Sequence, residues 1–118
     1  MTYKQKLENL IKSGMYSLVQ NLLRVLCCWL AGMITTADAQ DLFTECGYTF
    51  TAPTTTGAII LTNGTTTYTI VSLITAYHDN DYQKSDVMKL VVFAIIDGFK
   101  NAGYILDSER TQLEELPW

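Results

Sequence analysis

The chain is poor in charge and especially in basic residues, and this shortage excludes one class of partner. Only 17% of its 118 residues are charged, whereas an average soluble domain has about 25%. No Lys or Arg occurs from residue 25 to residue 83, and the sequence pI is about 4.7. Binding to nucleic acid requires clustered cations that displace counterions from phosphates. Nucleic acid is therefore not an expected partner.

Cysteine and histidine are also scarce, and their spacing fits neither a disulfide framework nor a metal site. Cys27 and Cys28 are adjacent and Cys46 stands apart, so the chain has no C-x-x-C zinc spacing and an odd number of thiols. The only histidine, His78, is distant from all three in sequence. We expect free thiols in a reducing, cytoplasmic setting, with no metal and no cofactor.

Long hydrophobic runs are absent. The most apolar 19-residue window, 16–34, contains Gln20, Asn21 and Arg24, which argues against a membrane span and a membrane partner. The segment Ala37-Asp38-Ala39 has the small-x-small form of a signal peptidase site and follows an apolar run. Because the residues before that run already have the pattern of an amphipathic helix, we expect this site not to be processed.

Threonine takes the place of charge in the middle of the chain. Sixteen residues are Thr, and eleven of them lie between residues 49 and 75. The length suits one domain with a substantial core. We predict an α+β fold in which residues 1–47 are helical, 48–75 form a β-hairpin or small antiparallel sheet, and 85–118 are helical with one long C-terminal helix.

Apolar spacing and capping residues predict the helices. They cover residues 3–12, 16–31, a short segment from the N-cap Thr35 to Gly47, 86–102, and a short segment near the C-terminus. In helix 16–31 the polar residues form one narrow stripe, so most of that helix must be covered by protein. In helix 86–102, Gly98 marks either a close helix crossing or a weak point.

The β section contains an Asn63-Gly64 pair between two β-prone runs, which predicts a hairpin with a type I′ turn. The return strand is expected from Thr65 to about residue 71. In that register Leu61 opposes Thr66 and Ile59 opposes Tyr68. This arrangement would give a largely apolar face and a Thr-rich face, as a half-buried sheet requires.

One aromatic residue conflicts with the pattern of helix 86–102. Phe93 falls in the middle of a polar stripe that includes Lys89 and Asp97. Either a neighbouring segment covers Phe93, or the stripe belongs to an interface with a partner. The C-terminal Trp118 either packs on its own domain or anchors a partner pocket. These observations make Phe93, Lys89, Asp97 and Trp118 the candidate interface residues.

Two other classes of site compete with an interface. A nucleotide-type ligand could be held at an inter-subunit pocket by Tyr68, Tyr77, Tyr82, Lys84 and Arg110. A small hydrolase could use His78 with Asp79 or Asp81 as acid and base. Because no nucleophile motif accompanies the segment 77–82, we expect it to be a solvated connector and predict no catalytic residues.

One sequence pattern runs through Gly14-Met15-Tyr16 and then Trp29 through Asp38. It consists of a helix, a glycine, an Ile-Thr pair and an acidic helix. This pattern resembles one found in small bacteriophage accessory and tail proteins. The resemblance covers about a quarter of the chain and implies a phage or prophage protein that acts by binding. The apolar run 22–28 departs from the pattern.

Taken as a whole, these features of the sequence predict a non-enzymatic protein that self-associates as a homo-oligomer.

Overall fold

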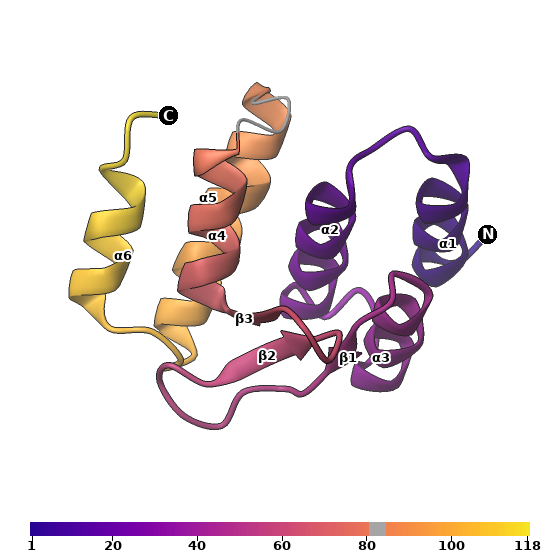
Figure 1. Ribbon diagram of the computed structural model, residues 1–118, viewed down its shortest axis with the longest axis horizontal. Helices are drawn as coiled ribbons and strands as arrows, with labels where there is room; N and C mark the ends of the chain where they lie inside the picture. The colour runs from indigo at the N-terminus through magenta and orange to yellow at the C-terminus, as the bar shows by residue number, and fades with distance from the viewer. Residues whose placement is uncertain (81–84) are drawn as a thin grey trace.

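The computed structural model describes residues 1–80 and 85–118. Its helices are α1 (Tyr3–Ser13), α2 (Leu18–Leu30), α3 (Thr36–Glu45), α4 (Ile70–Asp79), α5 (Asp86–Asn101) and α6 (Asp107–Glu114). Its strands are β1 (Thr49–Phe50), β2 (Ile59–Thr62) and β3 (Thr67–Thr69), in an antiparallel sheet of order β1-β2-β3. Helices α1, α2, α4, α5 and α6 stand side by side above the sheet, with α1 and α6 at opposite ends, and α3 lies beside β1 (Figure 1). The predicted α+β class is confirmed.

Helix α2 lies at the centre of the helical layer. It contacts α1, α3, α4 and α5, and four of its aliphatic side chains are fully buried, namely Leu22, Leu23, Val25 and Leu26. Even the polar stripe is covered, since Gln20 and Asn21 are only 2% and 7% exposed. The expectation that protein covers most of this helix is confirmed, and the cover comes from the same chain.

Helix α2 packs closely against α5 at Gly98. A Cβ atom added at this glycine would lie 3.3 Å from Cδ1 of Leu30, which is tighter than ordinary van der Waals contact. Gly98 therefore marks a close helix crossing, one of its two predicted roles.

Side-chain hydrogen bonds cap the N-terminus of α3. Thr35 Oγ1 accepts from the Asp38 backbone N–H at 3.1 Å, and the Asp38 carboxylate accepts from the Thr35 N–H at 3.3 Å. This is the capping box predicted from the sequence. Helix α3 is then joined to α1 by the Lys4 ammonium group, which lies 2.9 Å from Asp41 Oδ2.

The predicted end of the β section is wrong. Strand β3 ends at Thr69, and residues 70–79 form α4 instead of continuing the sheet. Thr69 Oγ1 accepts from the Ser72 N–H at 3.1 Å, while Ser72 Oγ accepts from the Thr69 N–H at 2.8 Å. The buried residues of α4 then follow at helical spacing, as Ile70, Leu73, Ile74 and Tyr77. Capping and burial outweigh the β propensity of this segment.

The predicted connector 77–82 is therefore helical at its start. Tyr77, His78 and Asp79 belong to α4, and Tyr77 is only 1% exposed. Residues 81 and 82 lie outside the described residues.

The hairpin turn also differs from the prediction. Asn63 Oδ1 accepts the backbone N–H groups of both Thr65 and Thr66, at 2.9 and 2.6 Å. The resulting loop is longer than a two-residue turn, so Leu61 pairs with Tyr68, and the predicted partners Thr66 for Leu61 and Tyr68 for Ile59 are wrong. An Asn side chain that satisfies two backbone donors competes with the type I′ turn.

A β-bulge changes which residues of β2 enter the core. The register shifts between Ile59 and Leu61, so that Ile60 and Leu61 are both buried while Ile59 is 54% exposed. Ile59 was predicted on the apolar face. A bulge locally breaks the alternation of a strand, and this explains the difference.

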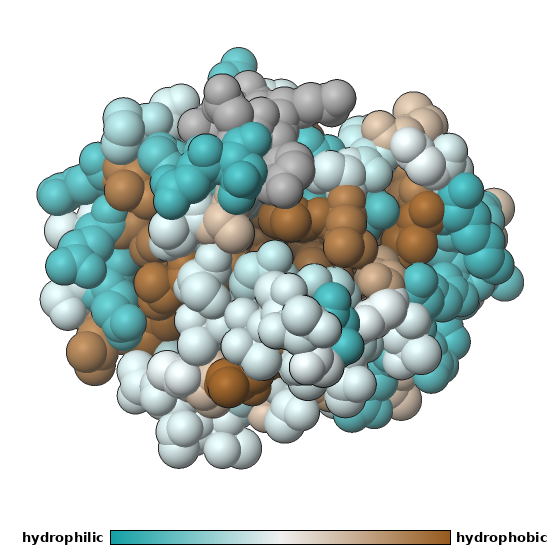
Figure 2. Space-filling view, in the orientation of Figure 1, coloured by the Kyte–Doolittle hydropathy of each residue, from teal (hydrophilic) through white to brown (hydrophobic). Residues whose placement is uncertain are grey.

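The surface reflects the unusual composition. Over the β section, at the bottom of the view, it is pale in Figure 2, as expected from threonine side chains, whereas hydrophobic side chains cross the middle of this face. Threonine hydroxyl groups thus provide the wet surface of the sheet.

If the Thr69 cap starts α4, its removal will destabilise the protein while a neighbouring change will not. We expect Thr69→Val to lower the free energy of unfolding by about 1 kcal/mol, and Thr69→Ser to restore it. The matched control is Thr67→Val, at an exposed strand position without a capping role. Urea unfolding followed by circular dichroism measures all three; equal stability of the two valine variants would contradict the capping explanation.

Candidate functional site

The chain's last residue gathers several of the predicted site residues. The Trp118 ring lies 4.9 Å from the His78 ring, 5.9 Å from Phe93 and 6.3 Å from Tyr77, centroid to centroid. Its Nε1–H donates to the Leu113 carbonyl at 2.9 Å. We call Tyr77, His78, Phe93 and Trp118 the C-terminal aromatic cluster. Phe93 is therefore covered by its own chain, the first of the two explanations for its position.

His78 is held by this arrangement on both ring nitrogens. Nδ1 lies 3.0 Å from Asp79 Oδ1, and Nε2 lies 3.2 Å from the Pro117 carbonyl oxygen. Both partners are acceptors, so the protonated ring can donate to both and the neutral ring to only one. Within residues 1–80 and 85–118, no hydroxyl or thiol is hydrogen-bonded to His78 as a nucleophile would be. These contacts connect α4 to the C-terminal residues.

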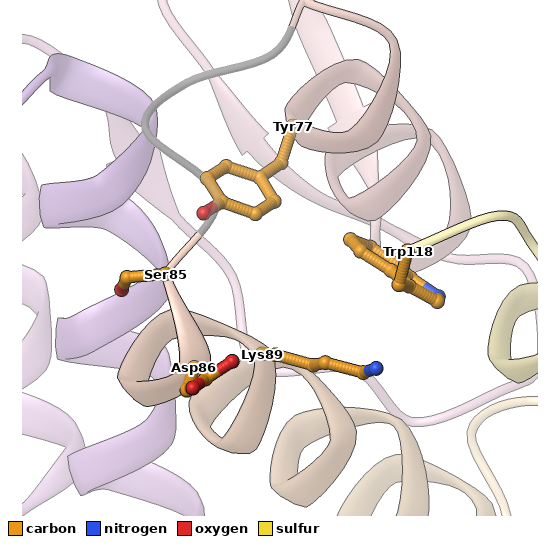
Figure 3. A pocket seen from close by; sticks show the side chains of 5 residues that line it. All are labelled: Tyr77, Ser85, Asp86, Lys89 and Trp118. Carbon is orange, nitrogen blue, oxygen red and sulfur yellow. The ribbon is translucent and has the colours of Figure 1, made fainter.

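A small cavity adjoins the cluster, lined by Tyr77, Ser85, Asp86, Lys89 and Trp118 (Figure 3). Its volume is about 70 Å³, far below the roughly 300 Å³ at which pockets for small organic ligands begin. Lys89 extends beneath the Trp118 ring in this view, and its ammonium nitrogen lies 5.7 Å from the centre of the Phe93 ring. The cavity is too small for a nucleotide.

Asp97 and Arg110 meet elsewhere, between α5 and α6. The Arg110 guanidinium lies 3.0 Å from Asp107 Oδ1 and 4.0 Å from Asp97 Oδ1. A hydrogen bond between Glu114 and Asp97, followed by burial and the Asp97 charge, raises the pKa of Glu114 above its usual range. Arg110 is thus surrounded by carboxylates of its own chain, which compete with any anionic ligand.

The three described residues of the predicted nucleotide-type site, Tyr68, Tyr77 and Arg110, lie in three different parts of the fold. Tyr68 lies in β3, where its ring is 5.9 Å from that of Tyr48, and burial, followed by the influence of Tyr68, raises the pKa of Tyr48. Tyr77 belongs to the C-terminal aromatic cluster and Arg110 to the α5–α6 contact. Tyr82 and Lys84, like the hydrolase candidate Asp81, lie outside the described residues.

A surface that the sequence reasoning missed lies on α5. Val87 and Leu90 are 61% and 72% exposed, Val91 is half-buried, and Ala94 is exposed. Their spacing of i, i+3, i+4 and i+7 places them on one side of the helix. We call these four residues the α5 stripe. The same spacing was visible in the sequence, but the apolar residues of an amphipathic helix are expected to face the core.

Beside the stripe is a cleft between α1, α2 and α5. Its volume is about 260 Å³, and its lining residues are Tyr3, Lys6, Leu7, Leu10, Arg24, Cys27, Cys28 and Val91. We call it the α1–α5 cleft. Val91 belongs to both the cleft and the stripe, so the two form one continuous surface. Burial raises the pKa of both cysteine thiols, which keeps them neutral and apolar at physiological pH.

Arg24 and Lys6 are the cations of this cleft. The Arg24 guanidinium lies 4.1 Å from the centre of the Tyr16 ring, and the Lys6 ammonium 5.1 Å from that of Tyr3. Neither forms an ion pair with a carboxylate in the part of the chain that the structure describes. Arg24 Nε is buried there without a hydrogen-bond partner. A second cavity of about 370 Å³ also borders Arg24.

Disulfides, metal ligands and membrane-spanning helices can also be looked for among the described residues. All three cysteines are free. Among residues 1–80 and 85–118, no three His, Cys, Asp or Glu side chains are grouped so that they could hold a metal ion. In the same ranges, every helix is too short or too polar to cross a membrane.

The C-terminal aromatic cluster predicts a stability effect. We expect Trp118→Ala to lower the free energy of unfolding by about 2 kcal/mol, because three ring contacts and one hydrogen bond are lost at a half-buried site. Trp118→Phe keeps the ring contacts and should lose less than half of that. Chemical unfolding measures both. A Trp118→Ala protein as stable as the wild type would show that the cluster does not hold the C-terminus.

Comparisons of the chain with protein-family models, curated proteins and solved structures find no match. Its candidate function therefore rests on the placement and chemistry of its own residues.

Proposed function

We propose that the protein is a non-enzymatic binding protein that self-associates through the α5 stripe. The observation that carries this proposal is the exposure of Leu90 and Val87, whose side chains are 72% and 61% exposed beside a cleft that is itself apolar. Contiguous apolar surface of this kind typically marks a contact with another molecule.

The spacing of the stripe suits a helix as the contacting element. Residues at i, i+3, i+4 and i+7 are those by which two helices pack against each other. The stripe carries no charge, so two copies can bring the same surface together without like-charge repulsion. A twofold dimer uses one patch twice, and this is the commonest form of homo-oligomer.

The interface residues predicted from the sequence have other contacts in this proposal. Phe93, Lys89 and Trp118 pack against one another in the C-terminal region, and Asp97 lies beside Arg110. On α5 they lie on the side next to the stripe, because Leu90 is close to Asp97 around the helix. In this proposal, the low share of charged residues is explained by an interface that covers Val87 and Leu90.

Compartment and origin are part of the proposal. Free thiols at Cys27, Cys28 and Cys46 support a reducing, cytoplasmic location. The local resemblance to small phage accessory and tail proteins supports a phage or prophage protein in a bacterial host, acting by binding. No nucleophile–base pair is assembled among the described residues, and this supports a non-enzymatic role.

Light scattering coupled to size exclusion tests self-association. We expect the wild-type protein at tens of micromolar to have about twice the 13.2 kDa mass of one chain. Leu90→Gln should raise the dimer dissociation constant at least tenfold, because about 2 kcal/mol of apolar burial is lost at each copy.

The matched control is Ile59→Thr, which changes another exposed aliphatic residue, on β2 and outside the stripe. It should leave the mass unchanged. A wild-type monomer at this concentration, or equal effects of the two variants, would overturn the proposal.

A further inference from the structure

We propose that the α1–α5 cleft binds an amphipathic monocarboxylate, with the alkyl chain in the cleft and the carboxylate between Arg24 and Lys6. This inference goes beyond self-association, because every residue of the cleft belongs to one chain. It defines a ligand class that the sequence analysis did not consider.

The lining of the cleft suits an alkyl chain. Helix α1 contributes Leu7, Leu10 and the Tyr3 ring, and α2 and α5 add the two neutral thiols and Val91. None of the lining residues is acidic. The volume of about 260 Å³ is slightly below the roughly 300 Å³ at which pockets for small organic ligands begin, which favours a slender chain over a large ring system.

Arg24 favours a carboxylate as the head group. The central carbon of its guanidinium lies 4.1 Å from the centre of the Tyr16 ring, and a cation–π contact of this kind uses none of the five N–H donors. Nε is buried without a partner among the described residues, and a buried donor without an acceptor is costly. A carboxylate accepts two parallel N–H bonds from a guanidinium and would satisfy it.

The remaining charges reinforce this choice. Lys6 also lines the cleft and has no carboxylate partner in the part of the chain described, whereas the nearby Lys4 lies within ion-pair distance of Glu8, Asp38 and Asp41. The two cations of the cleft are thus both without a carboxylate partner among the described residues. An anionic head group is attracted and a cationic one repelled.

A ligand bound in the cleft should shield Cys27 and Cys28 from alkylation, because these two residues line the cleft and Cys46 does not. We would alkylate the protein with iodoacetamide, with and without decanoate below its micelle concentration, and quantify each site by mass spectrometry. Cys27 and Cys28 should be protected at least fivefold. Cys46, whose pKa burial raises to about 11, should react slowly and at an unchanged rate.

The Leu90→Gln background keeps this test separate from self-association. Protection by decanoate in this background supports the ligand site whatever the oligomeric state. If Leu90→Gln abolishes dimers but decanoate still protects, both proposals stand. If Leu90→Gln abolishes dimers as expected but decanoate gives no protection, only the ligand site is overturned.

Two series of probes test the chemistry of head group and chain. Decylamine should protect at least tenfold less well than decanoate. Each methylene added between hexanoate and decanoate should strengthen binding about fourfold. Equal protection by decanoate, decanol and decylamine would overturn the carboxylate assignment and leave only a general apolar site.

Variants identify the head-group residues. Arg24→Met should weaken decanoate binding at least tenfold, and Lys6→Met should weaken it by a smaller factor. Lys12→Met, a change of the same kind on α1 outside the cleft, should have no effect. If circular dichroism shows that Arg24→Met is unfolded, the comparison of decanoate affinity between Lys6→Met and Lys12→Met tests the proposal instead. Unchanged decanoate affinity in folded Arg24→Met, or equal affinity in the two lysine variants, would overturn the proposal.

Discussion

Burial of α2 is the constraint on which the rest of the structure depends. This helix has too few polar residues for a surface position, and even Gln20 and Asn21 are covered. Four other helices must therefore pack around it, and α5 approaches so closely that only a glycine fits at position 98 without displacing Leu30. A small domain gains most of its stability by removing such apolar surface from water.

The C-terminal aromatic cluster completes this packing at the other side of α5. Trp118 covers Phe93, which would otherwise interrupt a polar helix face, and His78 holds the Pro117 carbonyl. Residues that suggested an interface or a catalytic site thus have intramolecular contacts. Phe93 on the polar face of α5 is covered by the chain itself, and the exposed apolar surface lies on the neighbouring side, at Val87 and Leu90.

One face therefore carries both proposals. The α5 stripe offers a contact to a second copy, and the adjoining cleft offers a site with unpaired cations at Arg24 and Lys6. They share Val91, so occupancy of the cleft and association through the stripe can influence each other. A cation beside an apolar cleft is costly to desolvate unless an anion accompanies it, and this is why the proposed ligand of the cleft is an anion.

The sequence by itself determined the elements whose causes are local: helical spacing predicted α1, α2, α3 and α5, and Thr35 with Asp38 predicted a cap. It failed at Thr69, where β propensity and a capping box compete, and at Asn63, whose side chain lengthened the turn. Only the tertiary structure decided that Trp118 covers Phe93 and that Arg24 remains unpaired. Those outcomes depend on residues distant in sequence, because long-range packing sets which side chains meet.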